Sequence, residues 1–174
     1  MAVGTGVRRQ QAAQTEAELK AAAVRVFARL GYLNTKITDI TAEAGRAAGS
    51  FYSHFPNKEA LLEALLTDLL AAGDDLAEDP AHNSDFSDRD AVRGHVANYW
   101  WFYKQHYVLM TALQQAAIVD ERFADRAREL MEPDLHHIAG HMAQARDKGV
   151  RLPAEPVVVA VLMRSAMVRT DPPA

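Results

Sequence analysis

The stretch from Thr35 to Lys58 limits what this chain can fold into more than any other part of the sequence. It predicts two short helices that meet at Gly45, because glycine adopts a positive φ without a steric penalty and so ends one helix and turns the chain. In the second helix, Phe51 and Phe55 are four residues apart and are expected to point inward together. The narrow apolar face of the first helix consists of Ile37, Ile40, Thr41 and Ala44.

The outer face of the second helix has the composition that a helix in a DNA major groove requires. Small residues let the backbone approach the bases, hydroxyl groups bind phosphates, and a cation contacts bases or backbone. No acidic side chain interrupts this face, which consists of Arg46, Ala47, Ala48, Ser50, Tyr52, Ser53 and His54.

The segments around this pair of helices make the pattern more specific. They follow one another in register as Phe27–Tyr32, Ile37–Gly45, Gly49–Phe55 and Asn57–Leu62. With them, the run from Leu19 to Leu70 resembles the N-terminal DNA-binding domain of the tetracycline-repressor (TetR) family of bacterial transcription regulators. The resemblance implies an all-α chain that acts as a homodimer on a near-palindromic, double-stranded DNA operator.

Two departures from the family pattern bear on the expected operator sequence rather than on the fold. The family usually has an apolar residue, Ser and often Lys after the turn glycine, and this chain has Arg46, Ala47 and Ala48. Lys36 replaces the threonine that usually caps the first helix of the pair, and Thr35 and Thr38 are nearby candidates for that role.

The resemblance divides the chain into two domains. Residues 1–58 are expected to form a three-helix, helix-turn-helix DNA-binding domain, in which residues 1–14 are a mobile arm. Residues 59–174 are expected to form a helical domain for effector binding and dimerisation. The family usually has one more helix than this chain accommodates before Ala174, so this domain is expected to lack the last helix.

Local signals predict where the helices begin and end. Thr15–Glu18 fits a capping box, and the helix that it opens is expected to end at Gly31. Asn57 is expected to cap a helix that runs to about Leu76. Ser87 and Asp90 are expected to cap the next helix, which runs to about His106. Further helices are expected from Val108 to Val119, from Asp120 to Lys148 and from Pro156 onward. Pro133 lies inside the second of these and predicts a kink or break near Arg128 to Glu132.

Charge is divided unevenly along the chain. Residues 1–58 hold eight Lys and Arg against four Asp and Glu, a net +4, whereas the whole chain carries −4. This asymmetry favours a basic face for nucleic acid on an acidic body, although chance scatter produces a similar excess. Arg8 and Arg9 either reach DNA from the arm or belong to a solvated tail.

The expected roles in DNA binding follow from side-chain chemistry. Arg46, Ser50 and Thr38 are assigned to contacts with base edges. Gly49 is expected to let the backbone of the helix approach the DNA closely. Ala47 and Ala48 offer apolar contact, for instance to a thymine methyl group. Phosphates are assigned to Tyr52, His54, Lys58 and Lys36, although Tyr52 and His54 have packing against the next helix as an alternative.

A second cluster suggests a place for a small molecule. Both tryptophans and three of the five tyrosines fall between Tyr99 and Tyr107, so the helix that carries them either fills a core or lines a cavity. From the residues alone, a plain core is the better interpretation. The resemblance implies instead a cavity for a hydrophobic or amphipathic effector, with Gln114, Tyr103 or His137 as polar anchors. The candidate lining residues are Trp100, Tyr103, Tyr107, Met110, Leu113, Gln114, His137, Ile138 and Met142.

Nothing in the sequence supports catalysis, a cofactor or a metal. His136, His137 and His141 lie close together, but no His-Glu-x-x-His pattern and no cysteine accompanies them. The absence of cysteine suits a cytoplasmic protein, and no apolar run has the roughly 18 residues of a membrane span. We therefore expect a transcription regulator. It is either a repressor that its effector releases from DNA or an activator. The alternatives are a small helical ligand carrier or enzyme and a helical protein-interaction module.

Overall fold

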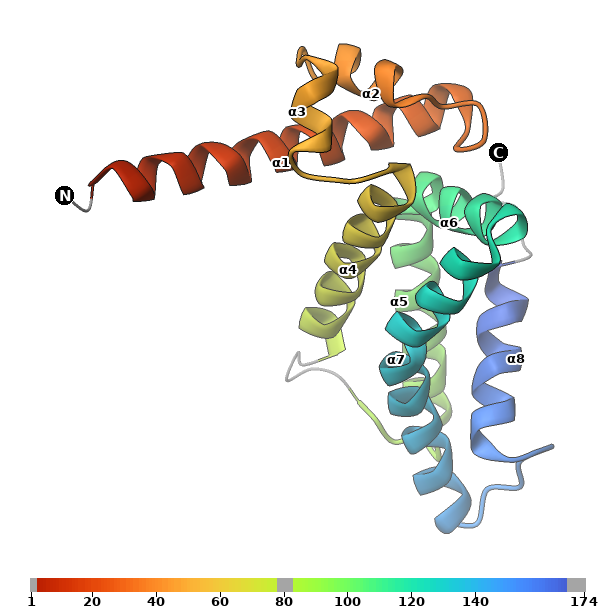
Figure 1. The fold of residues 1–174 in the computed structure, drawn as a ribbon. Helices are drawn as coiled ribbons and strands as arrows, with labels where there is room; N and C mark the ends of the chain where they lie inside the picture. Colours follow the sequence, from red (N-terminus) through yellow and green to blue (C-terminus); the bar gives the residue numbers. More distant parts are fainter. Residues whose placement is uncertain (1–2, 78–82, 169–174) are drawn as a thin grey trace. The chain divides into compact units, whose positions relative to one another are not determined.

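The computed structural model describes residues 3–77 and 83–168, and all regular structure within these ranges is α-helical (Figure 1). This confirms the all-α fold class. The helices are α1 (Val3–Leu30), α2 (Ile37–Glu43), α3 (Ala48–Tyr52), α4 (Lys58–Ala77), α5 (Arg89–Gln105), α6 (Tyr107–Val119), α7 (Glu121–Asp147) and α8 (Pro156–Val168). Among these described helices, none is long and apolar enough to cross a membrane.

The chain forms two compact units, neither of which is continuous in sequence. The first unit contains Met1–Asp68 and Val108–Asp125, and the second contains Leu69–Tyr107 and Arg126–Ala174. These units do not coincide with the expected domains, residues 1–58 and 59–174, because most of α6 groups with the N-terminal helices. The expected missing last helix concerns residues 169–174, which lie outside the described ranges.

The core of the first unit comes from apolar residues at helical spacing. Leu19, Val26 and Phe27 of α1 are buried, and Leu61 and Leu62 of α4 are completely buried. The helix α1 ends where the sequence predicted. Gly31 has φ 71°, and its N–H donates to the carbonyl oxygen of Phe27 at 2.9 Å. The positive φ explains why a glycine stands at this position.

The start of α1 differs from the prediction. The helix begins at Val3, and the hydroxyl of Thr15 donates to the carbonyl oxygen of Gln11 at 3.0 Å inside it, so Thr15 is not a cap. Residues 3–14 are therefore helical rather than an irregular arm (Figure 1). The physical reason is that Ala, Gln and Arg are good helix formers, and extending an existing helix avoids the cost of nucleation.

Two of the predicted helix starts are confirmed and one is shifted. Asn57 Oδ1 accepts from the N–H of Ala60 at 2.7 Å, and Asp120 Oδ1 accepts from the N–H of Phe123 at 3.1 Å. At α5, however, the cap is Asp88, whose Oδ1 accepts from the N–H of Asp90 at 2.9 Å. Ser87 instead bonds to Asp85.

The helix α7 continues through Pro133 from Glu121 to Asp147, so the helix does not break there, and a kink near Arg128 to Glu132 stays a prediction. Proline removes a single backbone hydrogen bond, and a helix of 27 residues retains those on either side of it. In the second unit, Phe86, Met142 and Ala145 form a buried cluster. Partly buried side chains packed against it are Val92, Ile138, Val150, Leu152, Val159 and Met163.

Candidate nucleic-acid interface

A hydrogen-bonded glycine turn joins α2 to α3. Gly45 has φ 64°, the N–H of Arg46 donates to Thr41 O at 2.8 Å, and the N–H of Gly45 donates to Ala42 O at 3.1 Å. This pair of bonds is a Schellman motif, which satisfies the last carbonyls of α2 and turns the chain sharply. The structure thus confirms the role predicted for Gly45.

The start of α2 does not use a threonine. The carboxylate of Asp39 accepts from the N–H of Lys36 at 2.8 Å, and no side chain caps the helix. The hydroxyl of Thr35 donates to Gly31 O at 2.7 Å instead, and Thr38 is exposed. Neither threonine proposed as a cap has this function, and the bond from the Lys36 N–H to the carboxylate of Asp39 helps to fix the first turn instead.

Two buried phenylalanines hold the short helix α3 on the first unit. Phe51 is fully buried and Phe55 is 5% exposed, with their ring centroids 5.6 Å apart. Their predicted inward orientation is confirmed. Because α3 spans only Ala48–Tyr52, it owes its place to these anchors rather than to its own backbone bonds.

Residues assigned to DNA from the sequence form the surface of this helix-turn-helix. Lys36, Thr38, Arg46, Ala47, Ala48, Gly49 and Tyr52 are exposed, and Ser50, His54 and Lys58 are half-buried. The 59% exposure of Tyr52 favours a role at the surface over packing against α4. No heavy atom lies within 4 Å of the position that a Cβ on Gly49 would take, so the surface at this point is open.

Arg46 is held at the start of α3 by an ion pair. Its Nε donates to Oε2 of Glu18 on α1 at 2.9 Å. This bond lowers the pKa of the Glu18 carboxyl, and both side chains are partly exposed. The sequence predicted a contact to bases for Arg46 and gave no sign of its partner, which lies 28 residues away.

Lys58 is turned inward, unlike the phosphate contact expected of it. Its Nζ donates to the carbonyl oxygens of Tyr32 at 2.8 Å and Thr35 at 2.9 Å, and lies 4.0 Å from the centroid of the Tyr32 ring. Burial lowers the pKa of this ammonium group. Two of its three donors are occupied, so Lys58 fixes the loop between α1 and α2.

Tyr32 connects three helices of the first unit. Its hydroxyl donates to Glu59 Oε1 at 2.7 Å, and its N–H donates to Oε1 of Gln115 on α6 at 2.9 Å. Burial and the bond to Glu59 raise the pKa of the phenol. The sequence singled out neither Glu59 nor Gln115, because a glutamine 83 residues away carries no local signal of this contact.

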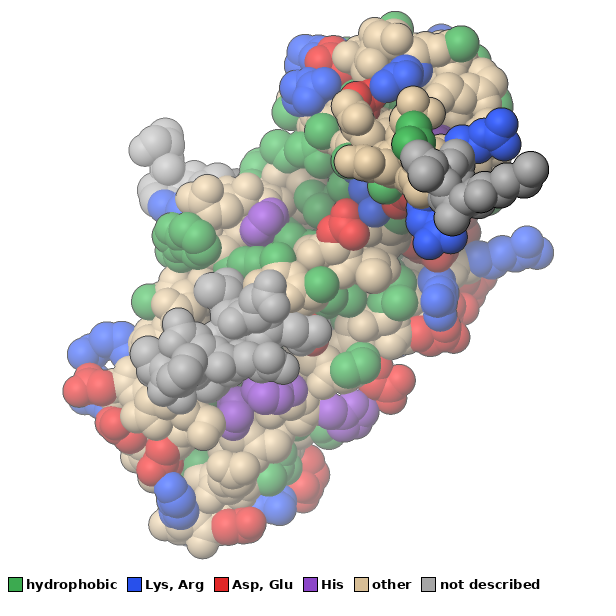
Figure 2. Space-filling view, turned by 90° about the vertical axis from the view of Figure 1, so that its left-hand side faces the viewer, with side chains coloured by type: hydrophobic (Ala, Val, Ile, Leu, Met, Phe, Trp, Pro, Cys, Tyr) green, Lys and Arg blue, Asp and Glu red, His purple; other side chains and the backbone are tan. Residues whose placement is uncertain are grey.

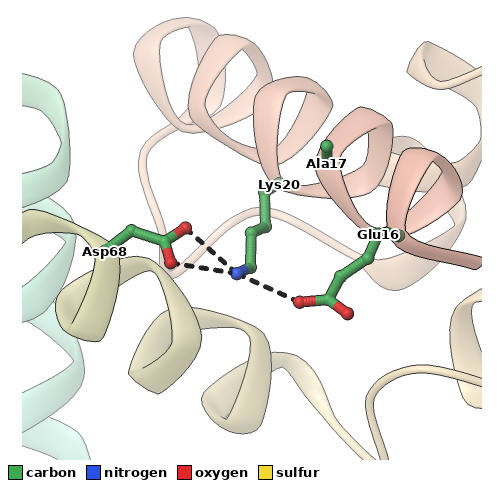
Figure 3. Close-up of a pocket in the computed structure, with 5 residues that line it drawn as sticks. Glu16, Ala17, Lys20 and Asp68 are labelled. Carbon is green, nitrogen blue, oxygen red and sulfur yellow. Dashed lines mark hydrogen bonds and ion pairs between the residues drawn. The ribbon is translucent and has the colours of Figure 1, made fainter. Parts of the chain in front are cut away.

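Most basic side chains of residues 1–58 have partners within the first unit. Arg25 and Arg29 both bind Glu43, at 2.7 and 2.8 Å. In the shallow pocket of Figure 3, Lys20 Nζ lies 3.1 Å from Glu16 and 3.0 Å from Asp68. On the face drawn in Figure 2, basic and acidic side chains likewise lie close together. The net charge of this segment therefore overstates the positive charge that DNA meets.

The side chains proposed for an effector cavity are divided between the units, so the cavity remains a prediction. Tyr103 and Met142 are buried, and Ile138 packs on the Phe86 cluster. Trp100 stacks on Tyr103 with a centroid distance of 6.2 Å. In the second unit lie Trp100, Tyr103, Tyr107, His137, Ile138 and Met142, and in the first Met110, Leu113 and Gln114.

The histidines of α7 contact one another. Nε2 of His137 and Nε2 of His141 are 3.1 Å apart. Within residues 3–77 and 83–168, no group of three or more His, Cys, Asp or Glu side chains is arranged to hold a metal ion.

Comparison with known proteins identifies the N-terminal part of the chain. Residues 19–65 match the profile described as "Bacterial regulatory proteins, tetR family". The HTH-type transcriptional regulator TtgR of Pseudomonas putida is 39% identical over 69 residues, which cover 40% of this chain and 33% of TtgR. The HTH-type transcriptional repressor NicS of Pseudomonas putida is 32% identical over 109 residues, covering 63% of this chain and 51% of NicS. The chain thus spans a third to a half of these curated relatives.

Solved structures extend the likeness beyond the matched segment. The fatty acid degradation regulator FadR from Bacillus halodurans superposes with a TM-score of 0.71 at 18% identity, covering 88% of this chain and 79% of FadR. FadR from Bacillus subtilis gives a TM-score of 0.68 at 17% identity, with 87% and 82% covered. At this identity the likeness concerns the fold. The helix-turn-helix geometry, the matched profile and the regulators found by sequence agree on the N-terminal part of the chain: residues 19–65 resemble the DNA-binding segment of the tetR family of bacterial regulatory proteins.

Proposed function

We propose that this protein is a DNA-binding transcriptional regulator that inserts α3 into the major groove of an operator. One observation carries the proposal: α3 presents an exposed face without an acidic side chain, while Phe51 and Phe55 anchor its other face. A short helix of this kind, with its N-terminal end at a tight turn, suits the role of a recognition helix. A protein that binds chromosomal DNA works in the cytoplasm, and this location is part of the proposal.

Side-chain chemistry assigns the contacts. Arg46, Ser50 and Thr38 face base edges, and Gly49, Ala47 and Ala48 allow close approach. Lys36, Tyr52 and His54 face phosphates. Lys58 is left out of this set, because its ammonium group already binds two carbonyl oxygens.

The proposed regulator works as a homodimer on a palindromic operator, because two-fold symmetry matches two half-sites one helical turn apart. The helix α8 supports this part of the proposal. Its exposed valines and leucine form an apolar surface that water disfavours. These residues and their exposed fractions are Val157 at 40%, Val158 at 45%, Val161 at 38% and Leu162 at 58%.

The proposed role is that of a repressor whose effector is hydrophobic or amphipathic. The aromatic side chains of α5 support this class of ligand, since few charged groups accompany them. Bacillus subtilis FadR, whose fold is similar, was solved in complex with stearoyl-CoA. Effector binding releases DNA only if the effector binds the released state more tightly than the DNA-bound state.

Selection of duplexes from a randomised pool at near-physiological salt tests the function. We expect a palindromic motif with two half-sites to be recovered. Ala48→Glu places a carboxylate on the exposed face of α3, where it repels DNA, and should abolish binding. The matched control is Ala97→Glu on the exposed side of α5, which should bind as the unchanged protein does. Equal binding by both variants would contradict the proposed use of α3.

A further inference from the structure

The N-terminal part of α1 stands outside the core. We name residues 3–14 the α1 extension. Every side chain described in it, from Gly6 to Gln14, is exposed, and the first fully buried residue of the helix is Leu19. Twelve helical residues span roughly 18 Å at 1.5 Å each. Figure 1 shows this extension as a straight continuation of the helix that packs in the first unit. Packing against the rest of the first unit therefore does not explain which residues the α1 extension contains.

Arg8 and Arg9 give the extension a positive charge, which no carboxylate of residues 3–77 and 83–168 pairs with. Five of the eight basic residues in residues 1–58 are bound within the first unit. These are Lys20, Arg25, Arg29, Arg46 and Lys58. Among the described residues, no carboxylate forms an ion pair with Arg8, Arg9 or Lys36. No acidic residue precedes Glu16 in the sequence.

An ion pair fixes where the extension begins relative to α3. Glu18 of α1 binds Arg46, which immediately precedes the N-terminal end of α3. That end of a recognition helix is the one that contacts base edges. Arg8 lies ten residues before Glu18, or roughly 15 Å along the helix, which corresponds to about four base pairs of B-DNA at 3.4 Å each.

We propose that the α1 extension is a second DNA contact, in which Arg8 and Arg9 bind phosphates that flank the base pairs read by α3. The inference rests on the proposed function and adds a surface to it. Phosphates carry no sequence information, so the contact strengthens binding to every duplex long enough to reach it. Because the extension is already helical, binding requires less ordering than an irregular arm would.

The salt dependence of operator binding tests this contact in the full chain. The probe is a duplex selected from the random pool, with ten base pairs of flanking DNA on each side. The variant Arg8→Ala with Arg9→Ala keeps helix propensity. Its matched control, Arg89→Ala with Arg151→Ala, removes two exposed arginines from the second unit. Both variants change the net charge by the same amount.

We expect the slope of log K against log salt to fall by about 0.9 for each phosphate that the Arg8/Arg9 variant no longer binds. The control should keep the slope of the unchanged protein. The ratio of operator affinity to random-duplex affinity should stay the same in both. A duplex trimmed to the half-sites should bind the unchanged protein and the Arg8/Arg9 variant equally.

A second pair of variants separates the placement of the charges from their number. Gln10→Pro keeps both arginines but breaks the helix between them and the core, because proline lacks the N–H that the helix needs. It should reduce the slope, whereas Gln10→Ala should not. Equal slopes for the Arg8/Arg9 variant and its control would overturn the inference while leaving the use of α3 intact. If the unchanged protein binds no duplex in a salt-dependent way, the proposed function and this inference both fail.

Discussion

Among the described residues of the first unit, some basic side chains bind other groups of the protein, and others are free to bind DNA. Arg25 and Arg29 share one carboxylate and tie α1 to the end of α2, and Lys58 fixes a loop through carbonyl oxygens. Such groups contribute to the shape of the unit rather than to its attraction for phosphates. Exposed ion pairs of this kind contribute little stability each, typically below about 1 kcal/mol, so their value lies in orientation.

Asp85 and Lys148 provide a residue-scale prediction about pH. Their Oδ2 and Nζ atoms are 2.7 Å apart, and this hydrogen bond, with those from Ser87, lowers the pKa of Asp85 to about 2 from an ordinary value of 3.8. A carboxyl whose pKa is lower in the folded state stabilises the fold above its unfolded pKa. That contribution is lost as pH falls through the folded pKa.

We therefore expect Asp85→Asn to lower the free energy of unfolding at pH 7, with a difference from the unchanged protein that shrinks below about pH 4 and closes near pH 2. Urea unfolding at a series of pH values measures this difference. The variant Lys148→Gln should lose most of the same pH-dependent part, because it removes the main partner. A difference for Asp85→Asn that is constant with pH would contradict the assignment.

At the scale of elements, α6 is tied to the loop after α1 by one hydrogen bond. Gln115 accepts from the backbone N–H of the buried Tyr32, and only 3.5 Å separates its Oε1 from the position of a Cβ on Gly31. Removing this acceptor leaves a buried donor without its partner. We expect Gln115→Ala to lower the free energy of unfolding by about 1–3 kcal/mol.

Urea unfolding checks this value, and amide hydrogen exchange at Tyr32 should speed up in the same variant. The exposed neighbour Gln114 supplies the control, since Gln114→Ala should change stability by less than about 0.5 kcal/mol. If both variants behave alike, the bond from Tyr32 has no energetic role.

The elements also show which features sequence predicts. Gly31, Gly45, Asn57 and Asp120 were assigned correctly, because turns and caps depend on residues a few positions apart. The start of α1 was missed, since a capping motif at Thr15 competed with the helix propensity of the residues before it. The partners of Arg46, Lys58 and Tyr32 were missed for another reason. They lie 23 to 83 residues away, and only the tertiary fold brings them together.

At the scale of the whole molecule, dimerisation gives the next prediction. We expect the protein to sediment as a dimer through α8, and Val158→Lys with Leu162→Glu to make it a monomer by placing charges on the apolar surface. A dimer contacts both half-sites at once, and its affinity for a palindrome exceeds that of a single contact by roughly 10²–10⁴. The monomer should therefore bind the palindrome at least about 100-fold more weakly than the dimer does.

Analytical ultracentrifugation and gel shift measure these two effects. Ile118→Lys is the control, because Ile118 is even more exposed, at 82%, but lies on α6 in the first unit. It should remain dimeric. A dimer that survives the charges on α8 would show that another surface joins the subunits.

The discontinuous first unit has a consequence for protein engineering. Regulators with new inputs are made by grafting the operator-binding segment of one protein onto the sensor of another, as though the two were separable cassettes. Here a graft that ends at Asp68 leaves out Val108–Asp125, which belongs to the same compact unit. The loop after α1 would keep the phenol of Tyr32 and its contact with Lys58, but the Tyr32 N–H would lose its acceptor, Gln115 Oε1. A working graft therefore has to include Gln115 on α6 as well as the N-terminal helices.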